Sequence, residues 1–475
     1  MNSPPLQKGL LPERVEAAPI PLAGIRVAVF GMKRSGIAVA DFLAQREAVV
    51  TVLDEANPDK LAKSLDTLSA LPVKAVAGAE SYEQFGAPQL VVTSPAVPYD
   101  HPFLAAARAD DVPVIAEIEL AWRFCEVPML AVTGTNGKGT VVTLVADMLK
   151  RGGIRAQVAG NIGIPLISLA NITDTLDVVV AEISSFQLEN TRLFRPWLGM
   201  LLNVSPDHCD RHPDMAQYLS IKSRIFGHQH DCDLAVLNMD DHHVAKLAPE
   251  LRGTVLGVSL HSQSTAGRII DGDLVVQPPM AAPVHICSRK DLPFRGDHNV
   301  ANALCASLAA SACGISADAM LETLENYERP PHLLQLAGKV DGVTFIDDSK
   351  ATNPAAAIAD LNEIEGPLIL IAGGLSKGAN LSDFAMAAAE RAKHLVLIGE
   401  SAAEIAAAVA NRAAQETAIT MAESLAAAVR TAFDLAAPGD TVILAPGGAS
   451  FDMFEDMAQR GEVFCQAVRD LAHGN

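Results

Sequence analysis

Short apolar runs alternate with amphipathic segments along most of this 475-residue chain. Near the start, apolar runs at 25–30, 49–53 and 90–93 are typical of strands, and residues 37–45 have apolar positions at helical spacing. A further run at 112–116 closes this first unit. Because strands separated by helices form parallel sheets with right-handed crossovers, the pattern predicts an α/β fold.

The same alternation appears twice more, which predicts three α/β units. The second is expected to contain a strand at 129–132, a glycine-rich turn, a helix at 141–150, strands at 178–181 and 198–202, a turn-rich β region over 231–295 and a helix at 299–312. Adjacent prolines at 330 and 331 mark its end. The third is expected to contain strands at 344–346, 368–372, 394–398 and 441–445 and helices at 401–413 and 422–436.

These transitions predict the domain boundaries. Residues 1–21 hold five prolines among charged residues and no long apolar segment, so we expect a flexible N-terminal extension and no signal peptide. The first domain is expected over 22–125, a central domain over 126–329 and a C-terminal domain over 330–475.

The composition of the chain argues against several classes of protein. Half of the residues are apolar (49%) and 19% are charged, which excludes disorder for the bulk of the chain. The formal net charge of −20 disfavours a polyanionic partner, so we expect no nucleic-acid binding. The seven cysteines are scattered and form no disulfide framework, and no uncharged apolar run approaches the ~18 residues of a membrane span. We therefore expect a cytoplasmic monomer without membrane insertion.

The strongest chemical signal is the segment Thr133-Gly134-Thr135-Asn136-Gly137-Lys138-Gly139-Thr140, between a predicted strand and a predicted helix. Glycines let backbone N–H groups surround a phosphate, the helix N-terminus adds partial positive charge, and a lysine reaches the terminal phosphates. A hydroxyl just after the lysine usually holds Mg²⁺. An ordinary glycine-rich turn does not need this combination, so the segment predicts ATP binding.

Acidic and histidine side chains follow other predicted strands, where the ligand crevice of an open α/β sheet lies. Glu182 ends one strand and is placed to hold a metal ion, although alone it is equally typical of a solvated loop. His208 follows another strand and is a candidate ligand. A zinc site from His208, Cys209 and His212 is a competing interpretation, but adjacent His-Cys lacks a usual zinc spacing.

Amides and lysines complete the set of candidates. Asn299 and Asn302 are three residues apart on a predicted helix, so they share a face. Lys350 and Lys377 each follow a predicted strand, as anion-binding lysines do, whereas either one alone would also fit an ordinary surface position.

Six motifs occur in a fixed order along the chain: GTNGK, E-x-SSFQLE, N-x-x-x-DH-x-D-RH, HN-x-x-NA, DDSKATNP and GG-x-x-KG. In this order and spacing the chain resembles the Mur ligases of peptidoglycan synthesis, over nearly its whole length after the N-terminal extension. Within that family it is similar to the members that add D-glutamate to UDP-N-acetylmuramoyl-L-alanine. The residues alone leave open whether the glutamate is the D or the L form.

The resemblance implies an ATP-dependent amide ligase that works through an acyl phosphate. It also implies a Rossmann-like N-terminal domain for the UDP-sugar, a central ATP-binding domain with a phosphate-binding loop (P-loop), and a Rossmann-like C-terminal domain for the amino acid. ATP and two Mg²⁺ ions are the expected cofactors. Lys222 matches a lysine that is carbamylated in these enzymes, a reaction that needs the neutral amine, which burial favours.

The same resemblance implies a role for each site residue. The residues expected to contact ATP are Gly134, Thr135, Asn136, Gly137, Lys138, Gly139, Thr140, Asn302 and Asp348. Those expected to contact the UDP-sugar are Ser35, Asp54, Ser94, Asn161 and Ser184, and those expected to contact glutamate are Lys350, Thr352, Lys377 and Ser450. The expected metal ligands are Thr140, Glu182, His208 and carbamylated Lys222, and the expected catalytic residues are Lys138, Glu182, His208, Lys222 and Lys350.

The chain also departs from the family pattern. Gly139 replaces a usual serine, so the Mg²⁺ hydroxyl is expected from Thr140. Leu333 stands where an arginine usually contacts ATP phosphate, and Ala96 and Met457 replace a usual glycine and phenylalanine. These departures leave a non-catalytic nucleotide-binding relative as an alternative. There are two further alternatives: a folylpolyglutamate-synthase-like ligase, and a nicotinamide oxidoreductase that uses only the first unit.

Overall fold

The computed structural model of the protein describes residues 10–15, 18–412 and 417–473, without the side chains of residues 411 and 412. Of the expected N-terminal extension, residues 1–9 and 16–17 lie outside the described residues. The chain forms two compact units. The first comprises the chain up to Val204 with residues 216–293 and 300–326, and the second comprises 205–215, 294–299 and the chain from Tyr327 onward.

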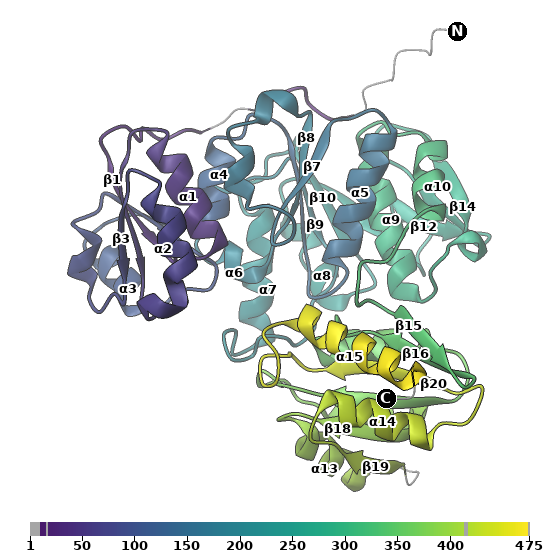
Figure 1. Cartoon of the computed structure of the whole chain (residues 1–475). Coiled ribbons are helices and arrows are strands. Elements are labelled where there is room, and N and C mark those ends of the chain that lie inside the picture. Colours follow the sequence, from purple (N-terminus) through teal and green to yellow (C-terminus); the bar gives the residue numbers. More distant parts are fainter. Residues whose placement is uncertain (1–9, 16–17, 413–416, 474–475) are drawn as a thin grey trace. The chain divides into compact units, whose positions relative to one another are not determined.

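The first sheet has five parallel strands in the order β3-β2-β1-β4-β5 within the described residues before the P-loop. It is part of the purple, N-terminal region in Figure 1. Its strands are β1 (Arg26–Phe30), β2 (Val49–Asp54), β3 (Lys74–Ala77), β4 (Leu90–Thr93) and β5 (Val114–Ala116). The helices of this region are α1 (Arg34–Ala44), α2 (Ala62–Ser69), α3 (Pro102–Ala109) and α4 (Glu117–Arg123). Strand β4 is fully buried, as expected for a parallel strand covered on both faces.

The central sheet runs in the order β14-β13-β12-β11-β10-β9-β6-β8-β7. Among the described strands, only the two pairings at the β14 edge, β12 with β13 and β13 with β14, are antiparallel. Its strands are β6 (Met129–Thr133), β7 (Ala156–Gly160), β8 (Val178–Glu182), β9 (Leu198–Leu201), β10 (Leu234–Asn238), β11 (Thr254–Val258), β12 (Gly267–Ile270), β13 (Asp273–Val276) and β14 (Val284–Ser288). The neighbouring helices are α5 (Lys138–Arg151), α6 (Ser185–Leu188), α7 (Met215–Ser223), α8 (His242–Ala245), α9 (Asp297–Ala312) and α10 (Ala317–Glu325).

The C-terminal sheet runs in the order β15-β16-β20-β17-β18-β19, and β15 is antiparallel to its neighbour. Its strands are β15 (Gln335–Val340), β16 (Val343–Asp347), β17 (Leu368–Gly373), β18 (Ala392–Ile398), β19 (Ala418–Met421) and β20 (Thr441–Gly447). Its helices are α11 (Pro354–Leu361), α12 (Ser382–Arg391), α13 (Ala402–Arg412), α14 (Leu425–Leu435) and α15 (Met457–Ala472).

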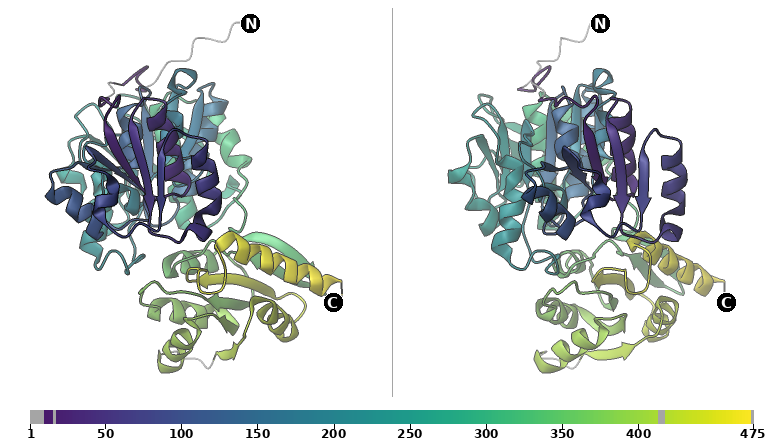
Figure 2. Two further views of the ribbon diagram at one scale, coloured as in Figure 1. Left: turned by 60° about the vertical axis from the view of Figure 1, so that its left-hand side comes forward. Right: turned by 90° about the vertical axis from the view of Figure 1, so that its left-hand side faces the viewer.

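Alternation along β17 shows why this last sheet is covered on both faces. Leu368 and Leu370 point into a core formed with α11, α12 and α13, whereas Ile369 and Ile371 point into a second core formed with α14 and α15. Successive side chains of a strand face opposite sides, so an apolar run has to be covered twice. Both helical layers are visible around this sheet in Figure 2.

The three α/β regions expected from the pattern are confirmed, and the differences concern edges and helix starts. The helix after the P-loop begins at Lys138, not at 141, because Gly137 adopts a left-handed conformation (φ 81°) that ends the turn and starts the helix. Strands β3, β15 and β19 lie at or next to sheet edges and were not expected, since their sequences show no continuous apolar run. In the part of the chain that the structure describes, every helix is too short or too polar to cross a lipid bilayer.

Candidate active site

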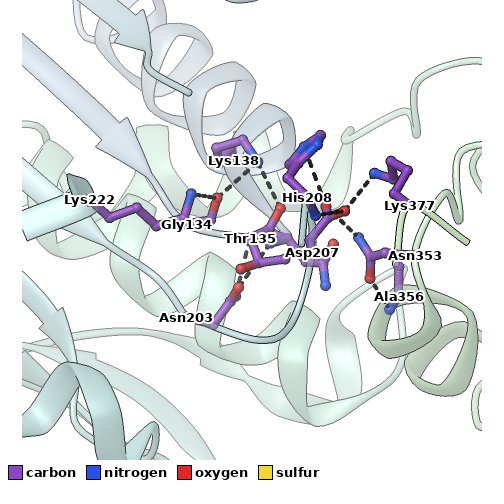
Figure 3. A network of polar contacts seen from close by, with 11 residues as sticks. Gly134, Thr135, Lys138, Asn203, Asp207, His208, Lys222, Asn353, Ala356 and Lys377 are labelled. Atoms are coloured by element: carbon purple, nitrogen blue, oxygen red, sulfur yellow. Dashed lines mark hydrogen bonds and ion pairs between the residues drawn. The ribbon is translucent and has the colours of Figure 1, made fainter. Parts of the chain in front are cut away.

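The P-loop connects β6 to α5 and is shaped by two glycines with positive φ, Gly134 (155°) and Gly137 (81°). Lys138 is the first residue of the helix, and its Nζ donates to the carbonyl oxygens of Gly134 at 3.0 Å and Thr135 at 2.7 Å. The ammonium group is therefore folded back over the loop (Figure 3). Its position beside the helix N-terminus is suited to the terminal phosphates of a nucleotide.

Asn203, just after β9, braces this loop. Its Oδ1 accepts from the backbone N–H of Asn136 at 2.8 Å, its Nδ2 donates to the carbonyl of Asn136 at 3.1 Å, and its own carbonyl accepts from Thr135 N–H at 3.0 Å. These bonds fix the loop backbone at Thr135 and Asn136. Asn203 lies in one of the six motifs, but sequence reasoning gave it no role; only the fold places it against the loop.

Lys222, near the end of α7, is almost fully buried, with 1% of its surface exposed. Its Nζ donates to the carbonyl of Gly134 at 2.8 Å and lies 4.5 Å from the ring centre of Tyr218. Lys222 and Lys138 thus share one acceptor in the P-loop (Figure 3). The structure brings together the two lysines that the sequence placed in one site.

Glu182 ends β8 and is buried. Asn161 donates to its Oε1 at 2.7 Å, while its Oε2 faces the first turn of α5, where a Cβ atom added to Gly139 would lie only 3.3 Å away. A carboxylate oxygen aimed at the start of the P-loop helix fits the site of a Mg²⁺ ion held together with a hydroxyl such as that of Thr140. Glycine at 139 allows this close approach.

Asn302 approaches the other side of the P-loop from α9. It is buried, and a Cβ atom on Gly137 would lie 2.5 Å from its Oδ1, so only glycine fits the turn. Asn302 therefore lies against the P-loop, which contains the other ATP-contacting residues expected in the first unit.

The expected UDP-sugar residues of the first sheet gather around the turn from Gly31 to Gly36. A Cβ atom on Gly31 would lie 2.5 Å from Ser94 Oγ, and the backbone N–H of Met32 donates to Asp54 Oδ2 at 2.9 Å. Ser94 Oγ is buried, and no described residue hydrogen-bonds to it. Ser35 lies in the first turn of α1.

Ser184 lies in the central sheet region, as the N-cap residue of α6. It forms a capping box with Gln187, whose backbone N–H donates to Ser184 Oγ at 3.3 Å. This structural role explains a serine at position 184 without a ligand.

In the second unit, Asp207 is the centre of a polar group (Figure 3). Lys377 Nζ lies 2.5 Å from its Oδ1, and Asn353 Nδ2 lies 3.5 Å from its Oδ2. His208 Nε2 lies 3.6 Å from the same Oδ2, and His208 adopts a left-handed backbone conformation (φ 55°). A candidate metal ligand and a candidate glutamate-binding lysine therefore share one carboxylate, which the sequence did not predict.

A buried arginine organises the loops of the expected glutamate site. Arg460 on α15 donates through Nε to Ser349 Oγ at 2.9 Å and through its two Nη atoms to the carbonyls of Ser349 (2.8 Å) and Gly448 (3.0 Å). Burial lowers the pKa of Arg460 to about 10, so it keeps its charge at neutral pH. It ties the loop that bears Lys350 and Thr352 to the loop that bears the buried Ser450.

Asp348 is fully buried and receives a hydrogen bond from Leu334 N–H on its Oδ1 at 3.1 Å. Burial, and next the charge of Asp360, raise the pKa of Asp348 above its ordinary value. Next to it, Asp347 Oδ2 lies 2.7 Å from His332 Nδ1. Leu333, the residue after His332, has an apolar side chain and brings no charge to this segment, where the family usually has an arginine.

The zinc interpretation of His208, Cys209 and His212 is wrong. Within the residues that the structure describes, the side chains that converge closely enough to hold a metal ion are those of His298, Asp360 and Glu363.

Family models match most of the chain. The Mur ligase MurD-like N-terminal domain matches residues 25–116, the Mur ligase middle domain residues 132–310, and the Mur ligase glutamate ligase domain residues 334–448. The chain belongs to the Mur ligase family. Each match lies within one of the expected domains, whose boundaries stay predictions.

Curated relatives agree with this membership. The UDP-N-acetylmuramoylalanine–D-glutamate ligase of Pelotomaculum thermopropionicum is 40% identical over 449 residues, 94% of this chain and 98% of the relative. The enzyme of the same name from Geobacter metallireducens is 39% identical over 456 residues, 95% of this chain and 99% of the relative. The chain is thus similar to ATP-dependent ligases along nearly its full length.

Solved structures of Mur ligases share the three-domain fold. MurF of Thermotoga maritima, solved with ADP, gives a TM-score of 0.60 at 15% identity and covers 90% of this chain and 95% of its own. A folylpolyglutamate synthase of Mycobacterium tuberculosis gives 0.55 at 18% identity but covers only 72% of this chain and 91% of its own. The MurD-like match over residues 25–116 accounts for the first sheet, which the folylpolyglutamate alternative left without a matching role. The middle-domain match over residues 132–310 includes the P-loop, which the nicotinamide alternative left unused.

Proposed function

We propose that this Mur ligase joins D-glutamate to UDP-N-acetylmuramoyl-L-alanine at the expense of ATP. The observation that carries the proposal is the 40% identity, over 94% of the chain, to a ligase named for that reaction. The reaction uses metabolites of the cytoplasm, and we place the protein there as a monomer.

The chemistry requires activation of a carboxylate, because an amine does not displace its oxygen directly. The alanyl carboxylate attacks the γ-phosphorus of ATP, the bond to the β-phosphate oxygen breaks, and an acyl phosphate and ADP result. The glutamate amine then attacks the acyl carbon, a tetrahedral intermediate forms, and inorganic phosphate leaves as the amine loses its proton. Positioning and charge stabilisation supply most of the rate enhancement in such phosphoryl transfers.

The P-loop residues support the first step. Lys138 is held at the helix N-terminus by two carbonyls, which a phosphate oxygen can replace as its partners. Asn203 keeps the loop backbone in place while ligands exchange. Asn302, whose Oδ1 lies close to Gly137, would contact the nucleotide.

Glu182 and Thr140 would hold one Mg²⁺ ion, and His208 with carbamylated Lys222 a second. Such ions neutralise charge that develops on the phosphate oxygens. Burial of Lys222 supports the carbamate, since a buried amine is more readily neutral and the product is an anion that replaces a cation beside the P-loop. Before that reaction its Nζ is satisfied by the carbonyl of Gly134.

Lys350, Thr352, Lys377 and Ser450 would receive glutamate, whose two carboxylates need cationic partners. Arg460 supports this assignment, because it fixes the two loops on which three of these residues lie. Ser35, Asp54, Ser94 and Asn161 would bind the UDP-sugar, and the turn at Gly31, closed by Ser94 and Asp54, is shaped for a close approach of phosphate to the backbone.

The test is phosphate release from Mg-ATP and UDP-N-acetylmuramoyl-L-alanine with D-glutamate, L-glutamate or neither. Release that depends on D-glutamate supports the proposal and shows that Leu333 and Gly139 are compatible with turnover. Dependence on L-glutamate would change the product but keep the mechanism. ATP binding without release would establish the non-catalytic alternative.

A further inference from the structure

The second unit contains a cluster of metal-binding side chains that the proposed reaction does not use. His298, in the first turn of α9, has its Nε2 3.6 Å from Asp360 Oδ1 on α11 and 3.1 Å from Glu363 Oε1, two residues beyond the end of that helix. One ligand atom from each residue lies within 4.8 Å of the others. We propose that these three side chains bind a divalent transition-metal ion such as Zn²⁺.

The spacing of the ligand atoms fits such an ion. Metal–ligand distances of about 2.1 Å place neighbouring ligand atoms roughly 3.0–3.4 Å apart in octahedral and tetrahedral sites. The separations of 3.1 and 3.6 Å at His298 are close to these values without a change of fold. The ion would take the place of the proton that Nε2 shares with the carboxylates, and an imidazole ligand favours Zn²⁺, Co²⁺ or Ni²⁺ over Mg²⁺.

The charges around the cluster are a second and independent observation. The side chains of Asp360 and Glu363 are only 8% and 5% exposed. Two nearly buried carboxylates therefore converge on one imidazole. Burial, and next the charge of Asp360, raise the pKa of the fully buried Asp348, so the carboxylates that face the imidazole are those of Asp360 and Glu363.

Hydrogen bonds from neighbouring side chains orient the Glu363 carboxylate so that one of its oxygens faces His298. Arg329 Nη2 lies 2.6 Å from Glu363 Oε2, so the other oxygen, Oε1, is the one turned toward His298. Asn299 Nδ2 also donates to Oε1 and fixes its direction. Such hydrogen bonds to ligating carboxylates orient metal ligands in known sites. A bound ion would join the first turn of α9 to the end of α11.

Cobalt binding to the full-length protein tests the site without nucleotide. Protein freed of metal with a chelator is titrated with Co²⁺, and bound metal is counted by elemental analysis together with the visible absorption spectrum. We expect His298→Gln and Asp360→Asn to lose one equivalent of Co²⁺ relative to the wild type. His285→Gln is the matched control, because His285 is exposed and has one carboxylate, Asp273, at 3.9 Å.

A cysteine variant separates loss of the site from loss of the fold. His298→Cys keeps a metal ligand at the position, and its Co²⁺ complex is expected to add a thiolate-to-cobalt charge-transfer band that is absent from the wild type. Zn²⁺ should raise the Tm of the wild type by several degrees and leave that of His298→Gln unchanged. Equal Co²⁺ counts in wild type and His298→Gln, or a His298→Cys protein of normal Tm without the new band, would overturn the proposal.

Discussion

Lys377 Nζ lies 2.5 Å from Asp207 Oδ1, so the lysine proposed to receive glutamate is already paired with a buried carboxylate. The pair orients the ammonium group, and it also lowers the charge available to a substrate carboxylate. We expect Lys377→Met and Asp207→Asn each to lower kcat/KM for glutamate at least about tenfold, since removal of one partner strands the other charge. Because the two act as a unit, the double variant should lose no more than the worse single variant.

A double-mutant cycle with glutamate as the varied substrate measures this coupling. Lys393 pairs with Asp440 in the same unit at 2.7 Å, so Lys393→Met is the matched control. Strictly additive losses would show that Asp207 does not act through Lys377.

Glu117, the first residue of α4, makes stability depend on pH. Burial raises its pKa to about 7, only partly opposed by the hydrogen bond from Ile167 N–H. The folded protein therefore keeps this proton up to about pH 7, whereas the unfolded chain loses it above about pH 4.5. Stability from this group is complete at low pH and is lost as the pH rises through 7.

Glu117→Gln removes the titration but keeps the acceptor for Ile167. We compare the free energy of unfolding of the variant with that of the wild type at each pH, by denaturant unfolding. We expect this difference to favour the variant by up to about 3 kcal/mol more at pH 8 than at pH 5. Glu126→Gln, at an exposed position nearby, is the control. A parallel pH dependence in wild type and Glu117→Gln would contradict the expectation.

Thr140 is expected to supply the hydroxyl that the family usually has at position 139. Thr140→Val keeps the shape of the side chain, so a fall of roughly 10²-fold in kcat with a raised Mg²⁺ requirement would report the loss of a metal contact. Thr143→Val, one turn along the same helix, should have little effect. Adding Gly139→Ser to Thr140→Val should restore part of the activity, since a Cβ atom at 139 would lie 3.3 Å from the end of the Glu182 side chain, which needs to shift only slightly, and the new hydroxyl would reach the ion that Glu182 holds. Full activity of Thr140→Val would exclude the hydroxyl as a ligand.

Lys222 provides a test of carbamylation that does not depend on catalysis. We expect a carbamate carbon signal from labelled bicarbonate in the wild type and in Lys246→Ala, an exposed-lysine control, and none in Lys222→Ala. Turnover of Lys222→Ala should fall at least about 100-fold, because a charged group beside the reacting phosphate is removed. A wild-type protein without the signal, yet fully active, would show that the lysine acts as the cation.

The sequence predicted the parts of the site that are local and missed those that depend on distant packing. The P-loop and Glu182 lie in short motifs after apolar strands, Lys222 was identified only through the family resemblance, and the fold brings the three together. Arg460 lies more than a hundred residues from Ser349, which it binds, and nothing in its helical context marks it. The pairing of Lys377 with Asp207 likewise depends on two loops meeting.

The metal ligands show the same limit. His298 was part of a recognised motif, but Asp360 and Glu363 are spaced like ordinary residues of a solvated helix end, and only the fold places them opposite the imidazole. The alternative zinc site of His208, Cys209 and His212, which its sequence spacing already disfavoured, does not form among the described residues. Spacing along the chain therefore argued against one metal site but could not indicate the other.

Gly461 in α15 decides whether His332 keeps its place beside Asp347. A Cβ atom at 461 would lie 2.1 Å from His332 Nδ1 and 2.8 Å from Asp347 Oδ2. Alanine normally favours a helix over glycine by up to about 1 kcal/mol. Here the added methyl group must break the 2.7 Å contact between His332 and Asp347, which leaves a fully buried carboxylate without that partner. The clash outweighs the helix preference, and we expect Gly461→Ala to lower the free energy of unfolding by about 1–3 kcal/mol.

The same substitution should raise KM for ATP more than KM for UDP-N-acetylmuramoyl-L-alanine, because the displaced His332 adjoins the loop of Asp348, which we assign to the nucleotide. Gly227→Ala is the control, since its added Cβ would meet its nearest neighbour at an ordinary 3.4 Å and needs no unusual φ. Urea unfolding and steady-state kinetics on both variants separate the two effects. A Gly461→Ala protein as stable as the wild type would mean that His332 moves aside freely, and its contact with Asp347 would then contribute nothing to the fold.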